Sequence, residues 1–234
     1  SNPEDIDYEA EGISNALLID NTGIFRDRDG LSRHLKAKGV SQVLFTAPAK
    51  GDVPNIVYGI NHKDLDIVNE NVFSAASCTT NAIVPSLFVL ENEFGIEKGH
   101  IETIHAYTND QNLTDNYHKK PRRGRSAPMN MVITSTGAGS AAAKAIPSLA
   151  GKLTANAVRV PTPNVSLAIL SLSLKRNTTK EEVDNIMRNA ALAGDLVEQI
   201  SNFRTGIDNG LELLESSDDG FVPVLDSEGR LINH

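Results

Sequence analysis

The stretch ALLIDNTGIFRDRDGLSRHLKAKGVSQVLF, residues 16–45, decides the fold of the first part of the chain. It begins and ends with short apolar runs, at 16–19 and 42–45, of the length and composition that buried parallel strands have. Between these runs, Leu31 and Leu35 lie on one face of a helix. The stretch therefore predicts a strand, a helix and a second strand, which is the repeating unit of a doubly wound parallel sheet.

The residues on either side extend this unit in one direction only. A third strand is expected at 56–58, after the breaker-rich residues 47–52. Before Ile13, nothing supplies the first strands of a doubly wound sheet or a glycine-rich turn. We therefore expect an α/β fold in which residues 1–76 are the tail of a Rossmann-type sheet.

The pattern of apolar and polar residues changes after Asn71. A helix is expected from about Cys78 to Gly95, because apolar residues three and four apart share one face. The pair Thr179 and Glu182 forms a capping box that begins another helix, whose apolar face would pack on a sheet. Strands are expected at 101–107, 129–134, 157–160 and 165–174. These elements predict an α+β domain with a mostly antiparallel sheet over residues 77–234.

The composition indicates a soluble globular protein. The chain has 234 residues, of which 40% are hydrophobic and 22% charged, so disorder is excluded and no disulfide or metal staple is needed. No apolar run approaches the roughly 18 residues of a membrane span, and the acidic start is unlike a signal peptide. A cytoplasmic protein without membrane contact is expected. The single cysteine, Cys78, excludes a disulfide framework and a thiolate-rich zinc site, and no metal site is expected.

The net charge of -8 is unevenly distributed along the chain. Residues 116–180 contain no Asp or Glu and eleven Lys or Arg. The densest basic run, 119–125, has one aromatic residue nearby, Tyr117, and the rest of the chain is acidic, so a nucleic-acid partner is not favoured. The segment instead predicts a site for a smaller anion.

Cys78 and His105 are the candidate catalytic pair. Cys78 lies between a predicted strand at 72–75 and a predicted helix, where unpaired N–H groups and the helix dipole favour a thiolate. His105 ends a predicted strand and provides a base that can order this thiolate. Either residue alone is more often structural, but the Ser, Thr and Asn residues around Cys78 favour a reactive thiol. The other histidines have loop-like or exposed settings and are given no role: His34, His62, His100, His118 and His234.

Residues 134–142 follow a predicted strand and begin an alanine-rich helix. Gly137 to Ala142 fits the G-x-G-x-x-G/A dinucleotide fingerprint, but the acidic residue that the fingerprint needs about 20 positions later is absent. A phosphate held by Thr136 and by backbone N–H groups at the helix start is the better interpretation. Arg159 would complete that site as a bidentate donor.

Five motifs occur in the order and spacing of one enzyme family. The first two are the most specific, SCTTN at 77–81 and HAYTNDQ at 105–111, and they are followed by RRGR at 122–125, TSTGA at 134–138 and RVPTP at 159–163. With these motifs the chain resembles the phosphorylating glyceraldehyde-3-phosphate dehydrogenases from about residue 16 to about residue 200. Two earlier pieces resemble the end of the family's nucleotide-binding domain, NTGIF at 21–25 and TAPAKG at 46–51.

The resemblance implies a reaction and its residues. Cys78 would attack the aldehyde, hydride would pass to NAD or NADP, and phosphate would release the acyl group from a thioester, with His105 as acid and base. Phosphate groups would be held by two sets of residues: Ser77, Thr79, Thr136 and Gly137 for inorganic phosphate, and Thr108, Arg123 and Arg159 for glyceraldehyde 3-phosphate. The cofactor would be touched by Thr22, Gly23 and Thr46. The basic loop would pack across a neighbouring subunit, which implies a homotetramer.

The chain departs from the family pattern at both ends. Residues 1–76 resemble the C-terminal part of the NAD(P)-binding domain, without its first strand, its glycine-rich turn and the acidic residue that selects NAD over NADP. Residues 77–234 resemble the catalytic domain, but the likeness fades after about residue 200. The family's closing segment, with the Asn that orients the nicotinamide, has no clear match here. Ser216, Ser217 and Asp218 match only part of the family sequence that leads to that segment. An incomplete or naturally shortened dehydrogenase is therefore expected, with half of the cofactor site missing.

Two alternatives stay open. An erythrose-4-phosphate dehydrogenase is the nearest competing enzyme, although HAYT at 105–108 favours the triose enzyme. From another class, the chain would be an inactive fragment or paralogue that binds a partner subunit or senses oxidants through Cys78. The sequence leaves undecided whether NAD or NADP is used, whether the reaction serves glycolysis or gluconeogenesis, and whether the chain acts alone.

Overall fold

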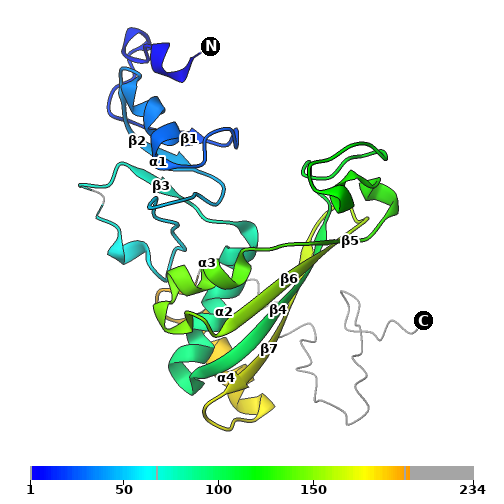
Figure 1. Ribbon diagram of the computed structural model, residues 1–234. Helices are drawn as coiled ribbons and strands as arrows, with labels where there is room; N and C mark the ends of the chain where they lie inside the picture. The colour runs from blue at the N-terminus through cyan, green and yellow to red at the C-terminus, as the bar shows by residue number, and fades with distance from the viewer. Residues whose placement is uncertain (1, 67, 198, 201–234) are drawn as a thin grey trace.

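The computed structural model describes residues 2–66, 68–197 and 199–200, which form two sheets with helices around them (Figure 1). The expected divergence after about residue 200 and the residues Ser216, Ser217 and Asp218 lie outside the described residues. Within the described part, no helix has the length and apolar character needed to cross a membrane. Nor does that part bring together three or more His, Cys, Asp or Glu side chains that could hold a metal ion.

The first sheet contains three parallel strands in the order β1-β2-β3. Two of them, β1 (Ala16–Asp20) and β2 (Val40–Phe45), confirm the predicted pair of strands. The connection between them begins with one turn of helix, α1 (Arg28–Leu31), and continues as the 3-10 helix η3 (Ser32–Lys36). The predicted strand, helix, strand unit is therefore present, with the second half of its helix wound as 3-10.

The third strand does not lie at 56–58, and that prediction is wrong. It is β3 (Val72–Ser74), which pairs with β2. Val57 instead begins a turn that is fixed by Asn61, whose Oδ1 accepts the Val57 N–H at 2.7 Å. The Val57 side chain is fully buried in the core of the second part of the chain. The apolar run at 56–58 thus makes a tertiary contact rather than a strand.

The second sheet has the strand order β5-β6-β4-β7. Its strands are β4 (Ile96–Ala106), β5 (Val132–Thr134), β6 (Leu153–Val160) and β7 (Ser166–Leu174). Antiparallel pairs join β4 to β7 and β5 to β6, whereas β4 and β6 are parallel. The predicted α+β domain with a mostly antiparallel sheet is confirmed, and each of the four expected strands is present.

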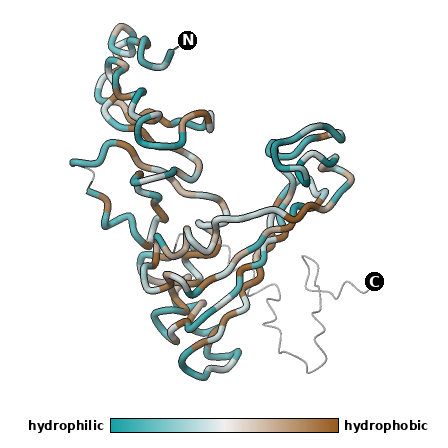
Figure 2. The backbone as a smooth tube through the Cα atoms, viewed as in Figure 1, coloured by the Kyte–Doolittle hydropathy of each residue, from teal (hydrophilic) through white to brown (hydrophobic). Residues whose placement is uncertain are grey.

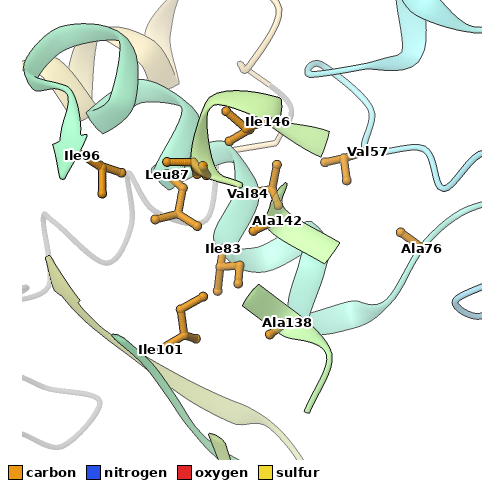
Figure 3. Packing of buried hydrophobic residues seen from close by; sticks show 11 residues of the cluster. Val57, Ala76, Ile83, Val84, Leu87, Ile96, Ile101, Ala138, Ala142 and Ile146 are labelled. Carbon is orange, nitrogen blue, oxygen red and sulfur yellow. The ribbon is translucent and has the colours of Figure 1, made fainter. Parts of the chain in front are cut away.

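Two helices, α2 (Cys78–Phe94) and α3 (Ala138–Ala145), cover one face of this sheet (Figure 1). Ile83 and Leu87 of α2 are buried in one cluster with Ile101 of β4 (Figure 3). Each fully buried side chain of this size stabilises the fold by roughly 1.5–3 kcal/mol. Packing along the helix therefore fixes the position of its first residue, which is the cysteine.

The helix α4 (Lys180–Leu192) begins where it was predicted. The Thr179 hydroxyl accepts the Glu182 N–H at 3.2 Å, as a capping box requires. The Glu182 carboxylate in turn accepts a hydrogen bond from the Thr179 backbone, so the predicted box forms. The same carboxylate also accepts from Thr178 and Arg176.

The predicted packing of α4 on the sheet is wrong. Its apolar residues form a cluster with Val89 of α2 and with Leu196 and Ile200, and among the described residues this cluster contains none from a strand. The reason is that α2 already covers the sheet with Ile83 and Leu87, and presents Val89 on another side.

Candidate active site

Cys78 is the first residue of α2, and its side chain is exposed. The residue before it, Ser77, caps the helix, because its Oγ accepts the Thr80 N–H at 3.0 Å. Asn81 donates from Nδ2 to the carbonyl oxygens of Ala75 and Ser77, at 2.8 and 2.9 Å. These bonds fix the turn between β3 and α2 and hold the thiol at the positive end of the helix.

His105 lies at the end of β4 and faces this thiol. Its Nε2 is 3.6 Å from the Cys78 Sγ, which is within hydrogen-bonding distance of sulfur. On the other side of the ring, Nδ1 is 2.7 Å from the carbonyl oxygen of Ala106. The structure therefore brings the two predicted catalytic residues together, as nucleophile and base.

Arg159 adds a positive charge to this pair. The parallel register of β4 and β6 places it opposite His105, and its Nη1 is 2.5 Å from the His105 Nδ1 and 3.0 Å from the Ala106 oxygen. Burial lowers the pKa of Arg159 and the positive charge of Arg123 adds to this effect, whereas the neighbouring Cys78 and Asp110 partly oppose it. The guanidinium is thus half-buried beside the catalytic pair.

The loop between β4 and β5 contains the other residues predicted for the substrate phosphate, and Figure 2 shows much of this loop as hydrophilic. Thr108 is exposed, and its N–H and hydroxyl both donate to Gln111 Oε1, at 3.0 and 3.4 Å. Arg123 forms an ion pair with Asp110 and is mostly buried. Arg125 pairs with Asp115 at 3.3 Å. Two of the basic residues in the loop are therefore paired with aspartates from earlier in the same loop.

Gln111 is a residue that the sequence analysis did not single out. It is 4% exposed, and it holds both the backbone and the hydroxyl of Thr108. Its position six residues after His105 gives no periodic signal of burial, so only the folded loop identifies it.

The residues predicted for inorganic phosphate lie at the starts of two helices. Gly137 is the N-cap of α3, and the Thr136 Oγ1 accepts the Ala138 N–H at 3.2 Å. Thr79 is half-buried in the first turn of α2. A cavity of about 180 Å³ is lined by Thr80 of α2 and by Gly137, so the two helix starts border one hollow.

The residues predicted for the cofactor lie together at the carboxyl end of the first sheet. The Asp20 carbonyl oxygen accepts from Thr46, from its N–H at 3.0 Å and from its hydroxyl at 3.3 Å. The Asp20 carboxylate accepts the Thr22 N–H at 2.7 Å. Gly23 follows with a φ of 69°, which favours glycine. This edge is where open α/β sheets bind ligands.

The prediction that His34 has a loop-like or exposed setting is wrong, because it lies in the 3-10 helix η3. It is buried, and its Nε2 lies 3.2 Å from Oδ2 of Asp20, whose side chain is fully buried. Burial acts to raise the pKa of Asp20, but hydrogen bonds from Thr22 and His34 lower it below its usual value. The spacing of His34 three residues after the buried Leu31 could have indicated that it shares the inner face of the helix.

Comparison with known proteins identifies the second part of the chain. The model of the family described as "Glyceraldehyde 3-phosphate dehydrogenase, C-terminal domain" matches residues 77–207. A glyceraldehyde-3-phosphate dehydrogenase-like protein of Pseudomonas aeruginosa is 59% identical over 200 residues, which cover 86% of this chain and 43% of that protein. A glyceraldehyde-3-phosphate dehydrogenase of Zymomonas mobilis is 44% identical over 195 residues, which cover 83% of this chain and 57% of that enzyme. The chain spans about half the length of the curated relatives it matches.

Proposed function

Because the chain belongs to the phosphorylating glyceraldehyde-3-phosphate dehydrogenase family, we propose that it supplies the catalytic part of an enzyme that oxidises and phosphorylates glyceraldehyde 3-phosphate. The observation that carries this proposal is the 3.6 Å distance between Cys78 Sγ and His105 Nε2. A thiol at a helix start beside an imidazole is the arrangement that covalent catalysis through a thioester needs.

In the proposed reaction, the Cys78 sulfur attacks the aldehyde carbon and a C–S bond forms, while the aldehyde oxygen takes a proton from His105. Loss of hydride from this carbon, together with return of the proton to His105, converts the thiohemiacetal into a thioester. A nicotinamide cofactor, when bound, supplies the hydride acceptor. Inorganic phosphate then attacks the thioester carbon, the C–S bond breaks, and an acyl phosphate leaves with the Cys78 thiolate restored.

Inorganic phosphate is proposed to lie near the starts of α2 and α3. Ser77, Thr79, Thr136 and Gly137 would hold it with hydroxyl and backbone N–H groups. The support is that both helix starts border one cavity, and that unpaired N–H groups at such positions attract anions.

The phosphate of the substrate is proposed to bind Thr108, Arg123 and Arg159. The support is that Arg159 lies beside His105, and that Asp110 holds Arg123 in the same loop as Thr108. A guanidinium can bind a phosphate through two parallel hydrogen bonds, which orients the substrate as well as binding it.

The cofactor is proposed to be NAD or NADP, held in part by Thr22, Gly23 and Thr46. These residues fit that role because they lie at the carboxyl edge of the parallel sheet, and β3 of the same sheet leads directly to Cys78. Under this proposal residues 1–76 belong to the cofactor-binding domain and residues 77–234 to the catalytic domain.

A homotetramer in the cytoplasm is the proposed state of the protein. Its support is a set of large apolar side chains that are exposed on β5 and β7, among them Ile133 at 57% and Leu167 at 55%. Exposed apolar patches of this kind mark association surfaces. The pairing of Arg123 and Arg125 with aspartates supports a protein rather than a nucleic-acid partner for the basic loop.

The test is the absorbance of reduced cofactor when the chain is mixed with glyceraldehyde 3-phosphate, inorganic phosphate and either NAD or NADP. Turnover that disappears in Cys78→Ser would support the proposal. Faster turnover with erythrose 4-phosphate would favour the competing enzyme. A chain that forms no reduced cofactor, although Cys78 still reacts with iodoacetamide, would favour the inactive, thiol-sensing alternative.

A further inference from the structure

Gln111 holds Thr108 through the oxygen of its side-chain amide. The Thr108 N–H donates to Gln111 Oε1 at 3.0 Å, and the Gln111 N–H donates to the Thr108 carbonyl oxygen, also at 3.0 Å. Because a backbone N–H can only donate, the side-chain atom that faces it must be the amide oxygen, which fixes the orientation of the Gln111 amide. Two hydrogen bonds of ordinary length therefore tie these two residues to each other.

The nitrogen of the same amide is buried without a partner. Gln111 is 4% exposed, and among the described residues its Nε2 finds nothing to which it can donate. A buried donor of this kind destabilises the fold, and an apolar side chain of similar volume, such as methionine, would avoid that cost. The advantage of an amide at this position therefore lies in the hydrogen bonds that its oxygen accepts from Thr108.

The two bonds that Thr108 donates to Gln111 differ in strength. The N–H bond has an ordinary length of 3.0 Å, whereas the hydroxyl lies 3.4 Å from the same oxygen and is therefore held weakly. The hydrogen of a hydroxyl can rotate, so the Thr108 hydroxyl can exchange this weak bond for a stronger one to a charged phosphate oxygen. The N–H bond to Gln111 would stay in place, and Thr108 would bind phosphate without moving its backbone.

The turn that Thr108 and Gln111 close also contains Asp110, the acid that pairs with Arg123. The Asp110 N–H points back into this turn and donates to the Thr108 hydroxyl oxygen at 3.4 Å. The charges of Arg123 and Asp110 both act on the pKa of Arg159, so the turn lies close to that guanidinium. Fixing the turn at Gln111 thus positions Thr108 directly and Arg123 through Asp110.

We propose that Gln111 is a positioning residue for the phosphate group of the substrate. Its side-chain oxygen holds the Thr108 backbone so that the Thr108 hydroxyl can meet a phosphate ester that Arg159 also binds. This inference rests on the proposed function, which assigns Thr108, Arg123 and Arg159 to that phosphate. A neutral amide suits the role, because a carboxylate would accept the same bonds but place a negative charge beside the phosphate.

Hydrogen exchange of the Thr108 amide, followed by NMR, tests the geometry without any ligand. In the unsubstituted chain this amide should exchange about tenfold or more slowly than an unprotected amide, because Gln111 accepts its hydrogen bond. Gln111→Met removes the acceptor at similar volume and should abolish the protection. Gln111→Glu keeps an acceptor oxygen and should retain it. A Thr108 amide that is unprotected in the unsubstituted chain, or still protected in Gln111→Met, would overturn the proposal.

Calorimetric titration with glycerol 3-phosphate, at constant ionic strength, measures the effect on phosphate binding. We expect the dissociation constant to rise about tenfold in Gln111→Met. Alkylation of Cys78 by iodoacetamide without ligand should keep its rate, because Gln111 accepts its hydrogen bonds from Thr108 rather than from the catalytic pair. An unchanged dissociation constant, or a changed alkylation rate, would contradict a role in positioning the phosphate site.

Asn112→Leu is the matched control in the same loop. The Asn112 Nδ2 donates to the carbonyl oxygens of Asn116 and Tyr117, at 3.0 and 3.3 Å, so this variant loosens the loop without removing a contact of Thr108. Its affinity for glycerol 3-phosphate should stay within about twofold, and a tenfold loss there would contradict a specific role of Gln111. An unsubstituted chain with a protected Thr108 amide that binds no glycerol 3-phosphate would overturn the proposed phosphate site rather than the hold of Gln111 on Thr108.

Discussion

His105 is the residue whose loss should affect Cys78 most. In His105→Asn we expect alkylation of Cys78 by iodoacetamide at pH 7 to slow by about tenfold or more, because the base that takes the thiol proton is gone. The rate is followed by the mass of the protein over time. His100→Asn is the control, since this ring lies five residues earlier on β4 and bonds to Thr154. Equal rates in His105→Asn and the unsubstituted chain would show that the pair is not coupled.

Asp20 should make the stability of the chain sensitive to acid. Its pKa is lowered in the folded state, so its contribution is complete above the unfolded value of about 4 and is lost as the pH falls through the folded value. We expect Asp20→Asn to lower the free energy of unfolding at pH 7 by about 1–3 kcal/mol and to weaken its decline below about pH 4. Urea unfolding at several pH values measures both effects. Asp29→Asn, at an exposed position, is the control, and an equal loss there would contradict the assignment.

Single residues differ in how far the sequence can predict them. Cys78 and His105 each stand at the end of a predicted element and within a specific motif, so their roles could be inferred before the structure. The pair Asp20 and His34 could not, because it depends on how η3 packs against the end of β1. Gln111 was missed for the same reason, since its contacts arise from the folded loop.

At the scale of elements, the two helix caps allow a matched comparison. Ser77 caps α2 and Thr179 caps α4, each by accepting a backbone N–H three residues later. We expect Ser77→Ala and Thr179→Ala each to lower the free energy of unfolding by about 1 kcal/mol in urea. Only Ser77→Ala should change the alkylation rate of Cys78, because only α2 begins at that residue. An equal change in Thr179→Ala would mean that general stability, and not the cap, sets the reactivity.

Elements with long patterns were predicted well, whereas a short apolar run could mislead. The strands β4 and β7 and the helix after Cys78 extend over enough residues for their periodicity to be clear. The run at 56–58 is too short to distinguish a strand from a turn that buries Val57. The partner of α4 could not be predicted either, because periodicity identifies an apolar face but not what covers it.

At the scale of the whole molecule, two features change the view that the sequence gives. The boundary near residue 76 is not a boundary in the core, since Val57 and Ala76 pack in one cluster with Ile101. The basic segment is also less positive in space than in sequence, because Asp110 and Asp115 pair with two of its arginines. Arg159 is the basic residue that the structure places at the catalytic pair.

The most direct test of the central claim is acylation of Cys78 by 1,3-bisphosphoglycerate, the acyl phosphate product of the proposed reaction. The sulfur would attack the acyl carbon, inorganic phosphate would leave, and a thioester would remain, without need for a cofactor. Intact mass should show one 3-phosphoglyceryl group on the chain, mapped to Cys78, removable by hydroxylamine and absent from Cys78→Ser. A chain whose Cys78 reacts with iodoacetamide but never carries this acyl group would contradict the claim.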